Sequence, residues 1–232
     1  MDRMNVLINQ RLKALEDSEY KAFNKKIIPT KYEVLGVRMP ALKKLAKEVS
    51  ADPDVMAYLD NAEYTTYEHI LLYGLVVGQL KKVSLETVFH YLDPLILKFD
   101  NWAHVDTIVS SPQLFKKYPD ELLVHFLPLK SHEGEFTKRT FVILLMDYFM
   151  DEGHIDIALK HLSEVKQGQY YVDMAIAWAI SVALVKFYDK AVLLLEQKAF
   201  SKFVQNKAIQ KARESYRISP EVKDLLNGLK IR

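Results

Sequence analysis

Residues 170–187 read YYVDMAIAWAISVALVKF, and this stretch decides the fold class. Its apolar side chains recur at intervals of three and four residues, which is the period of an α-helix. No part of the chain shows a convincing alternation of apolar and polar residues at period two, the pattern of a half-buried strand. The sequence therefore predicts an all-α protein, with the same helical period in Arg3–Glu16, Tyr64–Leu80, Leu85–Phe99, Phe136–Met150 and Ala208–Tyr216.

The predicted helices come in pairs at a nearly constant spacing. We expect the first helix of each pair to begin near residues 64, 102, 136, 170 and 206. A period of about 35–45 residues with two helices per unit is typical of HEAT, armadillo and TPR repeats. The tryptophan, glycine and tyrosine of the TPR consensus are missing at the required offsets. We therefore expect a single domain over residues 1–232, an α-solenoid of HEAT-like helical hairpins with a concave groove.

Four dipeptides that end in proline predict helix starts. Proline suits the first helical position, because the N–H that it lacks would have no partner there. In each dipeptide an Asp or Ser stands before the proline, as a cap residue should. The four are Asp52-Pro53, Asp93-Pro94, Ser111-Pro112 and Ser219-Pro220.

The composition excludes several classes of chemistry. The chain has 232 residues, no cysteine and only 7 glycines, so a disulfide scaffold, a thiol nucleophile and a thiolate metal site are ruled out. No glycines fit the spacing of a nucleotide-binding loop. The 7 histidines include no HExxH motif, and no GxSxG nucleophile elbow is present. We therefore expect neither a metal nor a cofactor.

The longest apolar run, Ile70–Leu80, contains Gly74, Gly78 and Gln79. At roughly ten residues it is too short to span a bilayer. The first residues, MDRMN, open an amphipathic segment and not the apolar stretch of a signal peptide. We therefore expect a soluble cytoplasmic protein with no membrane partner.

The chain has a formal net charge of +2, but its charges are distributed unevenly along the sequence. Residues 1–50 carry 11 Lys or Arg against 6 Asp or Glu, and residues 201–232 carry 8 against 3. The middle segment, 51–200, carries 13 against 21. Basic ends around an acidic body could hold a polyanion between them. The alternative is that the lysines only keep amphipathic helices in solution.

Trp102 and Asp106 form the first candidate site. They are four residues apart, so on a helix they share one face. A carboxylate beside an indole can stabilise a cation, since the acid supplies charge and the ring its negative π-face. In the alternative interpretation, Trp102 packs in the core and Asp106 makes a cap or a salt bridge.

Two further segments extend this candidate site. Lys138-Arg139 begins a helix that is otherwise apolar, so Arg139 could hold a phosphate. Trp178, the only other tryptophan, lies in a later predicted first helix. If the first helices line the concave face, these residues and the Trp102–Asp106 pair fall on successive repeats and could converge.

In these residues the chain resembles the HEAT-like-repeat DNA glycosylases of the AlkD-like DNA alkylation repair family. No single motif is decisive, but the order and separation of several motifs are specific. The resemblance implies an α-solenoid whose basic concave groove takes duplex DNA. It also implies hydrolysis of the N-glycosidic bond of cationic purines alkylated at N3 or N7, by a monofunctional glycosylase of the DNA-3-methyladenine or 7-methylguanine type. The motifs are Leu35–Pro40, Leu42–Leu45, Trp102–Asp106, Lys138–Thr140, Ala175–Trp178 and Asn206–Lys211.

The resemblance assigns roles to individual residues. Asp106 would stabilise an oxocarbenium-like deoxyribose and orient the attacking water, as carboxylates do in glycosidases. Trp102 and Trp178 would contact the sugar-phosphate of the lesion. Base flipping is usual in DNA glycosylases, but this family works without a base pocket. We expect a monomer that binds double-stranded DNA carrying alkylated bases, its phosphates held by Arg139, Lys138, Arg38, Lys43, Lys44, Lys207 and Lys211.

The chain also departs from the family's pattern. Asn101 and Ala103 stand where the family often has an aromatic residue and an acid. Ser181-Val182 replaces a charged pair, and Asp173 would be an unfavourable neighbour for DNA if it lined the groove. These departures suggest a divergent branch. Two alternatives to an enzyme are therefore kept: a module that binds nucleic acid without cutting it, and a solenoid that binds proteins.

Overall fold

The computed structural model describes residues 3–232, and in this range the protein is all-helical. Its elements are fourteen α-helices and two short 3-10 helices, with one isolated β-bridge between Glu33 and Thr66. The all-α prediction is thus confirmed. The predicted N-terminal amphipathic helix is α1, Arg3–Ala14, while Met1 and Asp2 lie outside the described residues. None of the described helices combines the length and apolar character that crossing a membrane requires.

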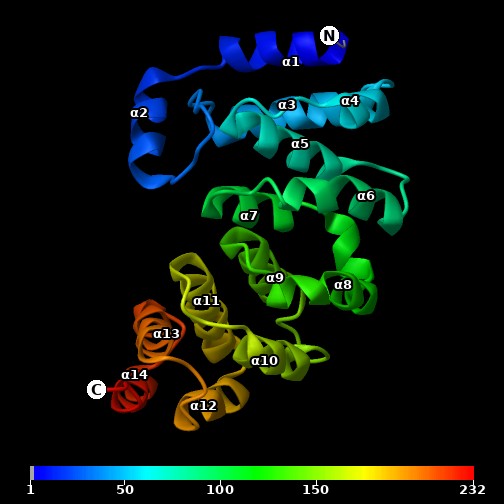
Figure 1. Ribbon diagram of the computed structural model, residues 1–232. Helices are drawn as coiled ribbons and strands as arrows, with labels where there is room; N and C mark the ends of the chain where they lie inside the picture. The colour runs from blue at the N-terminus through cyan, green and yellow to red at the C-terminus, as the bar shows by residue number, and fades with distance from the viewer. Residues whose placement is uncertain (1–2) are drawn as a thin grey trace. The chain divides into compact units, whose positions relative to one another are not determined.

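The chain divides into two compact units, the first ending at Lys117 and the second running from Tyr118 to Arg232. In the first unit α5 is the central helix, packed against α3, α6 and α7 (Figure 1). Nearly all of its side chains are buried, as expected of a helix that is apolar on every side. The elements are α1 (Arg3–Ala14), α2 (Ser18–Ile27), α3 (Met39–Ser50), α4 (Val55–Asn61), α5 (Tyr67–Gln79), α6 (Leu85–Ile96), α7 (Trp102–Val109) and the 3-10 helix Gln113–Lys117.

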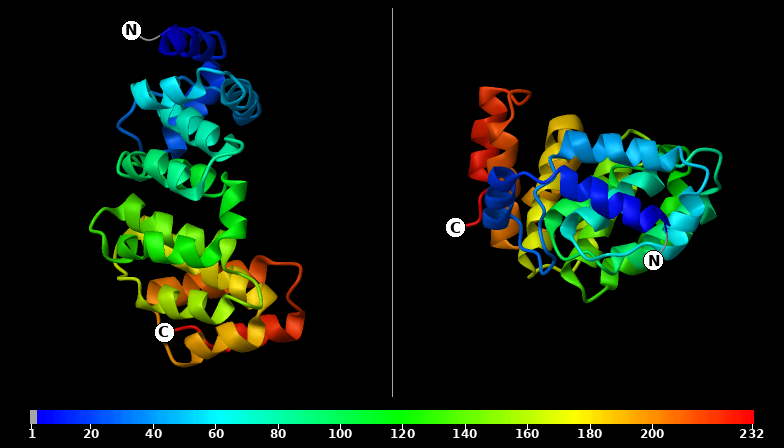
Figure 2. Two further views of the ribbon diagram at one scale, coloured as in Figure 1. Left: turned by 90° about the vertical axis from the view of Figure 1, so that its right-hand side faces the viewer. Right: turned by 90° about the horizontal axis from the view of Figure 1, so that it is seen from above.

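The second unit is organised in the same way around α11. This helix packs against α9 on one side and α13 on the other, and also contacts α10 and α12. Figures 1 and 2 show α14 beside α13, where the chain ends. The elements are α8 (Pro119–Phe126), the 3-10 helix Leu127–Ser131, α9 (Glu135–Tyr148), α10 (Ile155–Glu164), α11 (Tyr170–Lys186), α12 (Tyr188–Glu196), α13 (Lys202–Glu214) and α14 (Pro220–Gly228).

Alternate helices pack side by side within each unit. In the first unit α3 contacts α5, which contacts α7, and in the second α9 contacts α11, which contacts α13. These are the helices that the repeat spacing predicts as the first of each pair from α5 onward, and they begin at Tyr67, Trp102, Glu135, Tyr170 and Lys202. Stacked helical hairpins would produce this order of contacts.

The proline dipeptides give mixed results. Ser219-Pro220 begins α14, with the Ser219 hydroxyl accepting from the Val222 amide, so that prediction is confirmed. Asp93-Pro94 is wrong as a helix start, because α6 begins after the Ser84 cap and runs through Pro94 to Ile96. Pro94 lacks the N–H that would donate to the carbonyl of His90, and the helix ends two residues later.

The other two dipeptides also do not begin α-helices. Asp52 accepts a hydrogen bond from the Asp54 amide in a turn, and α4 starts only at Val55. Ser111-Pro112 precedes a 3-10 helix, not an α-helix. A cap residue followed by proline also suits turns, which is why the pattern failed at these positions.

A buried carboxylate fixes the segment that leads into α3. Glu68, on α5, is fully buried and accepts hydrogen bonds from the backbone N–H groups of Leu35, Gly36 and Val37 at 2.7–3.3 Å. Gly36 has φ +87°, a left-handed conformation that glycine adopts without cost. A Cβ at Gly36 would also collide with the backbone around Lys21, 2.6 Å from its nitrogen. This segment therefore requires glycine for two independent reasons.

We predict that Gly36→Ala lowers the free energy of unfolding by about 2–4 kcal/mol, from left-handed strain and overpacking together. Gly228→Ala is the matched control, because a Cβ there meets nothing within 4 Å and φ is not in the left-handed range. We expect it to stay within about 0.5 kcal/mol of wild type. Urea unfolding measures both variants, and equal midpoints for the two would contradict the packing described here.

Candidate functional site

Trp102 and Asp106 lie on the same accessible face of α7. Both side chains are partly exposed, while Ala103, His104 and Val105 between them are buried. The spacing of four residues thus places the indole and the carboxylate on one side of the helix, as the sequence predicts. A hydrogen bond of 3.3 Å from the Trp102 indole nitrogen to the carbonyl of Ile27 ties the ring to α2.

A buried polar network holds the N-terminus of α7. Asn101 is fully buried, and its side-chain oxygen accepts from the His104 amide at 2.9 Å as the helix cap. The His104 ring is also buried, with Nδ1 2.8 Å from the Asn101 amide nitrogen and Nε2 3.2 Å from the carbonyl of Tyr67 on α5. Asn101, one of the departures from the family's pattern, therefore has a structural role. An Asn before an apolar helix is a cap signal, so the sequence alone could have indicated this role.

Asp100 connects this network to the segment after α2. Its carboxylate accepts from the Thr30 hydroxyl, the Lys31 amide and the Asn101 side chain at 2.7–3.0 Å, and lies 3.3 Å from His104 Nδ1. Burial by itself would raise the pKa of Asp100, but the hydrogen bonds from these neighbours lower it below its usual value. The ionised carboxylate therefore helps to fix the helix that carries Trp102 and Asp106.

Beside α7, four lysines line a large groove that belongs entirely to the first unit. Its volume is about 920 Å³. We call it the lysine groove. No acidic residue is among the described residues that line it, and Thr107, the neighbour of Asp106 on α7, is one of them. The lysines are Lys43, Lys44, Lys47 and Lys81.

Two of these lysines, Lys43 and Lys44, are among the phosphate ligands predicted from the sequence. Lys47 and Lys81 were not among the predicted residues. Lys47 could have been found, because it follows Lys43 by four residues and so shares its face of α3. Lys81 follows α5 in a different part of the sequence, and only the packing of α5 against α3 brings it to the groove.

Arg38, another predicted phosphate ligand, does not line the lysine groove. Its guanidinium donates to the Asp17 carboxylate at 2.8 Å and lies over the ring of Tyr20, 5.1 Å from the centroid. The backbone N–H of Tyr20 and the Arg38 side chain both lower the pKa of Asp17. The structure therefore places Arg38 in contacts with α2 and its cap.

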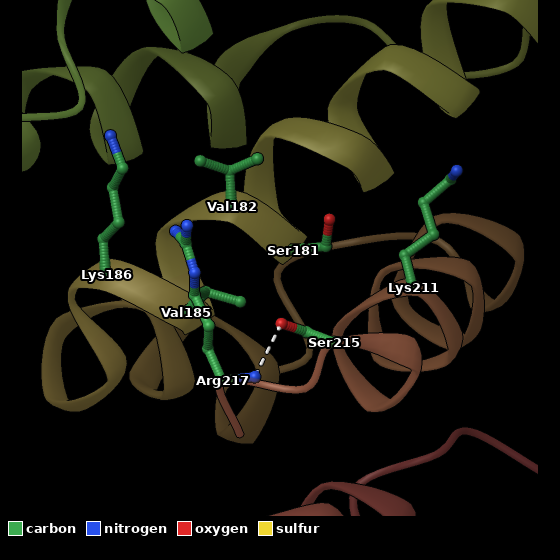
Figure 3. Close-up of a pocket in the computed structure, with 7 residues that line it drawn as sticks. All are labelled: Ser181, Val182, Val185, Lys186, Lys211, Ser215 and Arg217. Carbon is green, nitrogen blue, oxygen red and sulfur yellow. Dashed lines mark hydrogen bonds between the residues drawn. The ribbon is translucent and has the colours of Figure 1, made fainter.

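In the second unit, Trp178 lies on the open face of α11, with 38% of its surface exposed. Further along the same helix, Ser181, Val182, Val185 and Lys186 line a small pocket together with Lys211 of α13 (Figure 3). Lys211, a predicted phosphate ligand, therefore lies across this pocket from α11, the helix that carries Trp178. Lys207 is partly exposed and donates to Gln210 at 2.9 Å.

Lys138 and Arg139 are buried, although both were expected to bind phosphates. The Lys138 ammonium donates to the Gln169 side chain at 2.8 Å, and Arg139 donates to the carbonyl of Tyr171 at 2.6 Å. Lys138 is only 2% exposed. Both cations thus tie α9 to the beginning of α11, and the helix that carries them does begin where predicted, at Glu135.

Asp173, the acid that seemed unfavourable beside DNA, is also buried. Its carboxylate accepts from the amide of Gly168 at 3.0 Å, and Gly168 has φ +113°. Burial raises the pKa of Asp173 above its usual value. The side chain therefore stabilises the turn before α11 and is not part of an open surface.

The predicted four-residue site is distributed over both units. Trp102 and Asp106 belong to the first, and Arg139 and Trp178 to the second. Among residues 3–232, no group of three or more His, Asp or Glu side chains is placed to hold a metal ion.

We predict that Asp100→Asn lowers the free energy of unfolding at pH 7 by about 1–2 kcal/mol, because hydrogen-bond donors lose an ionised partner. A carboxylate with a lowered pKa stabilises the fold above its unfolded-state pKa, and this contribution is lost as the pH falls through the folded-state pKa. Wild type and variant should therefore converge as the pH falls through the lowered folded-state pKa of Asp100. Urea unfolding at pH 7 and in acid measures this. The exposed Asp224→Asn is the control, and a difference that does not change with pH would contradict the assignment.

The model of a family described as DNA alkylation repair enzyme matches residues 8–217, which include both units nearly in full. No match was found among curated proteins.

Proposed function

Because the chain belongs to the DNA alkylation repair enzyme family, we propose that it is a monofunctional DNA glycosylase. Its substrate is duplex DNA carrying cationic purines alkylated at N3 or N7, and it hydrolyses the N-glycosidic bond of the damaged base. We also propose that the helices stack as the HEAT-like repeats of an α-solenoid, and that Trp102 and Asp106 act at the lesion.

The arrangement of Trp102 and Asp106 carries this proposal. An alkylated purine is already positively charged and leaves as a neutral base, so the enzyme need not protonate it. The remaining task is to stabilise the positive charge that develops on the deoxyribose and to orient water for attack. A carboxylate performs both tasks, and an indole on the same helix face adds a negative π-surface for the cationic sugar.

The surroundings of α7 support catalysis at Asp106. Preorganised charge is effective because it need not rearrange during the reaction. Here Asn101 caps the helix, His104 and Asp100 hold that cap, and the indole of Trp102 is tied to Ile27. Trp102 and Asp106 therefore lie on a helix whose start is held by hydrogen bonds.

The lysine groove supports binding of the DNA backbone. Lys43, Lys44, Lys47 and Lys81 gather positive charge where no described lining residue is acidic. Such a surface releases counterions when it neutralises phosphates, which gives salt-dependent affinity for any DNA sequence. The local charge, and not the near-neutral total, is what matters for this contact.

The same groove favours a second candidate function, a module that binds nucleic acid without cutting it. This alternative keeps the lysine groove and assigns no chemistry to Asp106. The two functions differ in one measurable result, the release of free base.

We predict that Asp106→Asn reduces release of 7-methylguanine and 3-methyladenine from methylated duplex DNA by about a hundredfold or more, because the stabilising charge is lost. Single-turnover release, followed by chromatography of the free bases, measures this. Asp156→Asn is the matched control, since its carboxylate is exposed on α10 and pairs with Lys190. Unchanged release by Asp106→Asn would contradict the mechanism, and no release by the wild type would favour the binding module.

We predict that Lys43→Gln with Lys44→Gln weakens DNA binding by about tenfold or more and reduces the slope of log affinity against log salt by about 2, one per phosphate contact. Fluorescence anisotropy on an undamaged duplex at several salt concentrations measures both effects. The control is Lys160→Gln with Lys166→Gln, which removes the same charge from exposed positions of the second unit. If wild type binds no DNA even at low salt, the protein acts instead as a protein-interaction scaffold.

A further inference from the structure

The small pocket at the C-terminal part of α11 is a candidate for a separate binding site. Its volume is about 250 Å³, and it lies within the second unit. The C-terminal part of α11 forms one wall, and α13 with the chain beyond it forms the other (Figure 3). The seven lining residues are Ser181, Val182, Val185, Lys186, Lys211, Ser215 and Arg217.

Three of these residues are cations, and no lining residue is acidic. Lys186 and Lys211 rise on opposite sides of the pocket in Figure 3, with Ser181 and Ser215 between them. Within residues 3–232, Lys186, Lys211 and Arg217 form no ion pair with a carboxylate. Among the described residues, the Lys186 ammonium donates one long hydrogen bond, of 3.5 Å, to the carbonyl of Met150. The pocket thus concentrates positive charge that the protein itself does not neutralise.

Attraction to helix ends explains only part of this concentration. Lys186 and Lys211 lie in the last turns of their helices, where a cation is favoured by the helix dipole. Arg217 lies beyond the end of α13, and its side chain lines the same pocket. Its backbone N–H donates to the Ser215 hydroxyl at 3.2 Å, which leaves the hydroxyl proton of Ser215 to be donated to an anion.

The number of cations in the pocket indicates which class of anion it would bind. A phosphodiester inside a DNA strand carries one negative charge, whereas a terminal phosphomonoester carries nearly two and has three oxygens that accept hydrogen bonds. Two ammonium groups, a guanidinium and a hydroxyl match the doubly charged group better. Arginine is also well suited to bidentate contact with phosphate oxygens.

The chain that lines this pocket also carries an exposed aromatic residue. Tyr216 lies between the lining residues Ser215 and Arg217, and its side chain is fully exposed to solvent. A fully exposed tyrosine gains nothing from burial, but a nucleobase can stack on it. Only the last base of a strand offers a free π-face without disruption of the duplex stack.

We infer that this pocket binds the terminal phosphomonoester of a DNA strand, and that Tyr216 stacks on the terminal base. Lys186, Lys211 and Arg217 hold the phosphate, and the Ser215 hydroxyl donates to one of its oxygens. The inference rests on the proposed binding of DNA by this protein, but not on glycosylase activity. It assigns to the protein a preference for strand ends or nicks that carry phosphate.

Binding to DNA hairpins with one open end tests this inference. Three undamaged hairpins of identical sequence carry a 5′-phosphate, a 3′-phosphate or only hydroxyl groups at that end, and fluorescence anisotropy measures their affinity for the full chain. We expect one of the phosphorylated hairpins to bind about tenfold more tightly than the hydroxyl hairpin. Arg217→Gln and Lys211→Gln should each abolish that preference, and Tyr216→Ala should reduce it.

Lys202→Gln is the matched control, because it removes the same charge from an exposed position on α13 outside the pocket and should retain the preference. Equal affinity for all three hairpins, with equal losses in Arg217→Gln, would mean that the pocket holds an internal phosphodiester and would overturn the inference. A preference that survives Arg217→Gln and Lys211→Gln would overturn it as well.

A second probe separates this inference from the proposed function. Calorimetry compares deoxyadenosine 5′-monophosphate with deoxyadenosine, which lacks the phosphate. Binding of the monophosphate alone, lost in Arg217→Gln, would support the pocket even if the protein bound no duplex DNA and the proposed function failed. Absence of binding by both compounds, together with equal hairpin affinities, would overturn the pocket while base release still tested the glycosylase.

Discussion

The first unit depends on one buried carboxylate. Glu68 has no contact with solvent, and three consecutive backbone N–H groups, of Leu35, Gly36 and Val37, converge on it. A buried ionisable group costs free energy unless it is fully hydrogen-bonded, and here the backbone supplies these bonds only because Gly36 can adopt a positive φ. These hydrogen bonds fix the chain just before α3, and α3 carries three of the lysines of the lysine groove. The hydrogen bonds of Glu68, on the neighbouring helix α5, therefore help to set the position of these lysines.

A second polar network fixes the start of α7, the helix at which the chemistry is proposed. Asn101, His104 and Asp100 link the start of this helix to α5 and to the segment after α2. Residues that look anomalous in sequence are explained by such networks. Asn101 is a buried cap where an aromatic residue is common in the family, and Asp173 is a buried acid that holds a turn. Neither position indicates a weakened surface, so the departures from the family's pattern are partly structural substitutions.

Local pattern predicted the helices well and the helix starts less well. The period of three and four residues identified α5, α9 and α11, because burial of one helix face against neighbours leaves a repeated apolar signature. Proline after a cap residue failed at Asp93-Pro94, since the same dipeptide is tolerated near the end of a helix. Lys138 and Arg139 were expected to reach phosphate, but both are buried against α11. Their charge suggested a surface, and the sequence contains no sign of the amide and carbonyl oxygens that receive them.

The sequence by itself determined the all-α class, the family and the common face of Trp102 and Asp106. These properties depend on neighbours within about one helical turn, or on motifs in a fixed order. Only the tertiary structure decided which charges meet. Lys81 joins Lys43 because α5 packs against α3, and Arg217 joins Lys211 because the chain turns back after α13. Such encounters join residues that are distant along the chain, and helix packing, which is set by the shape and burial of apolar side chains, brings them together.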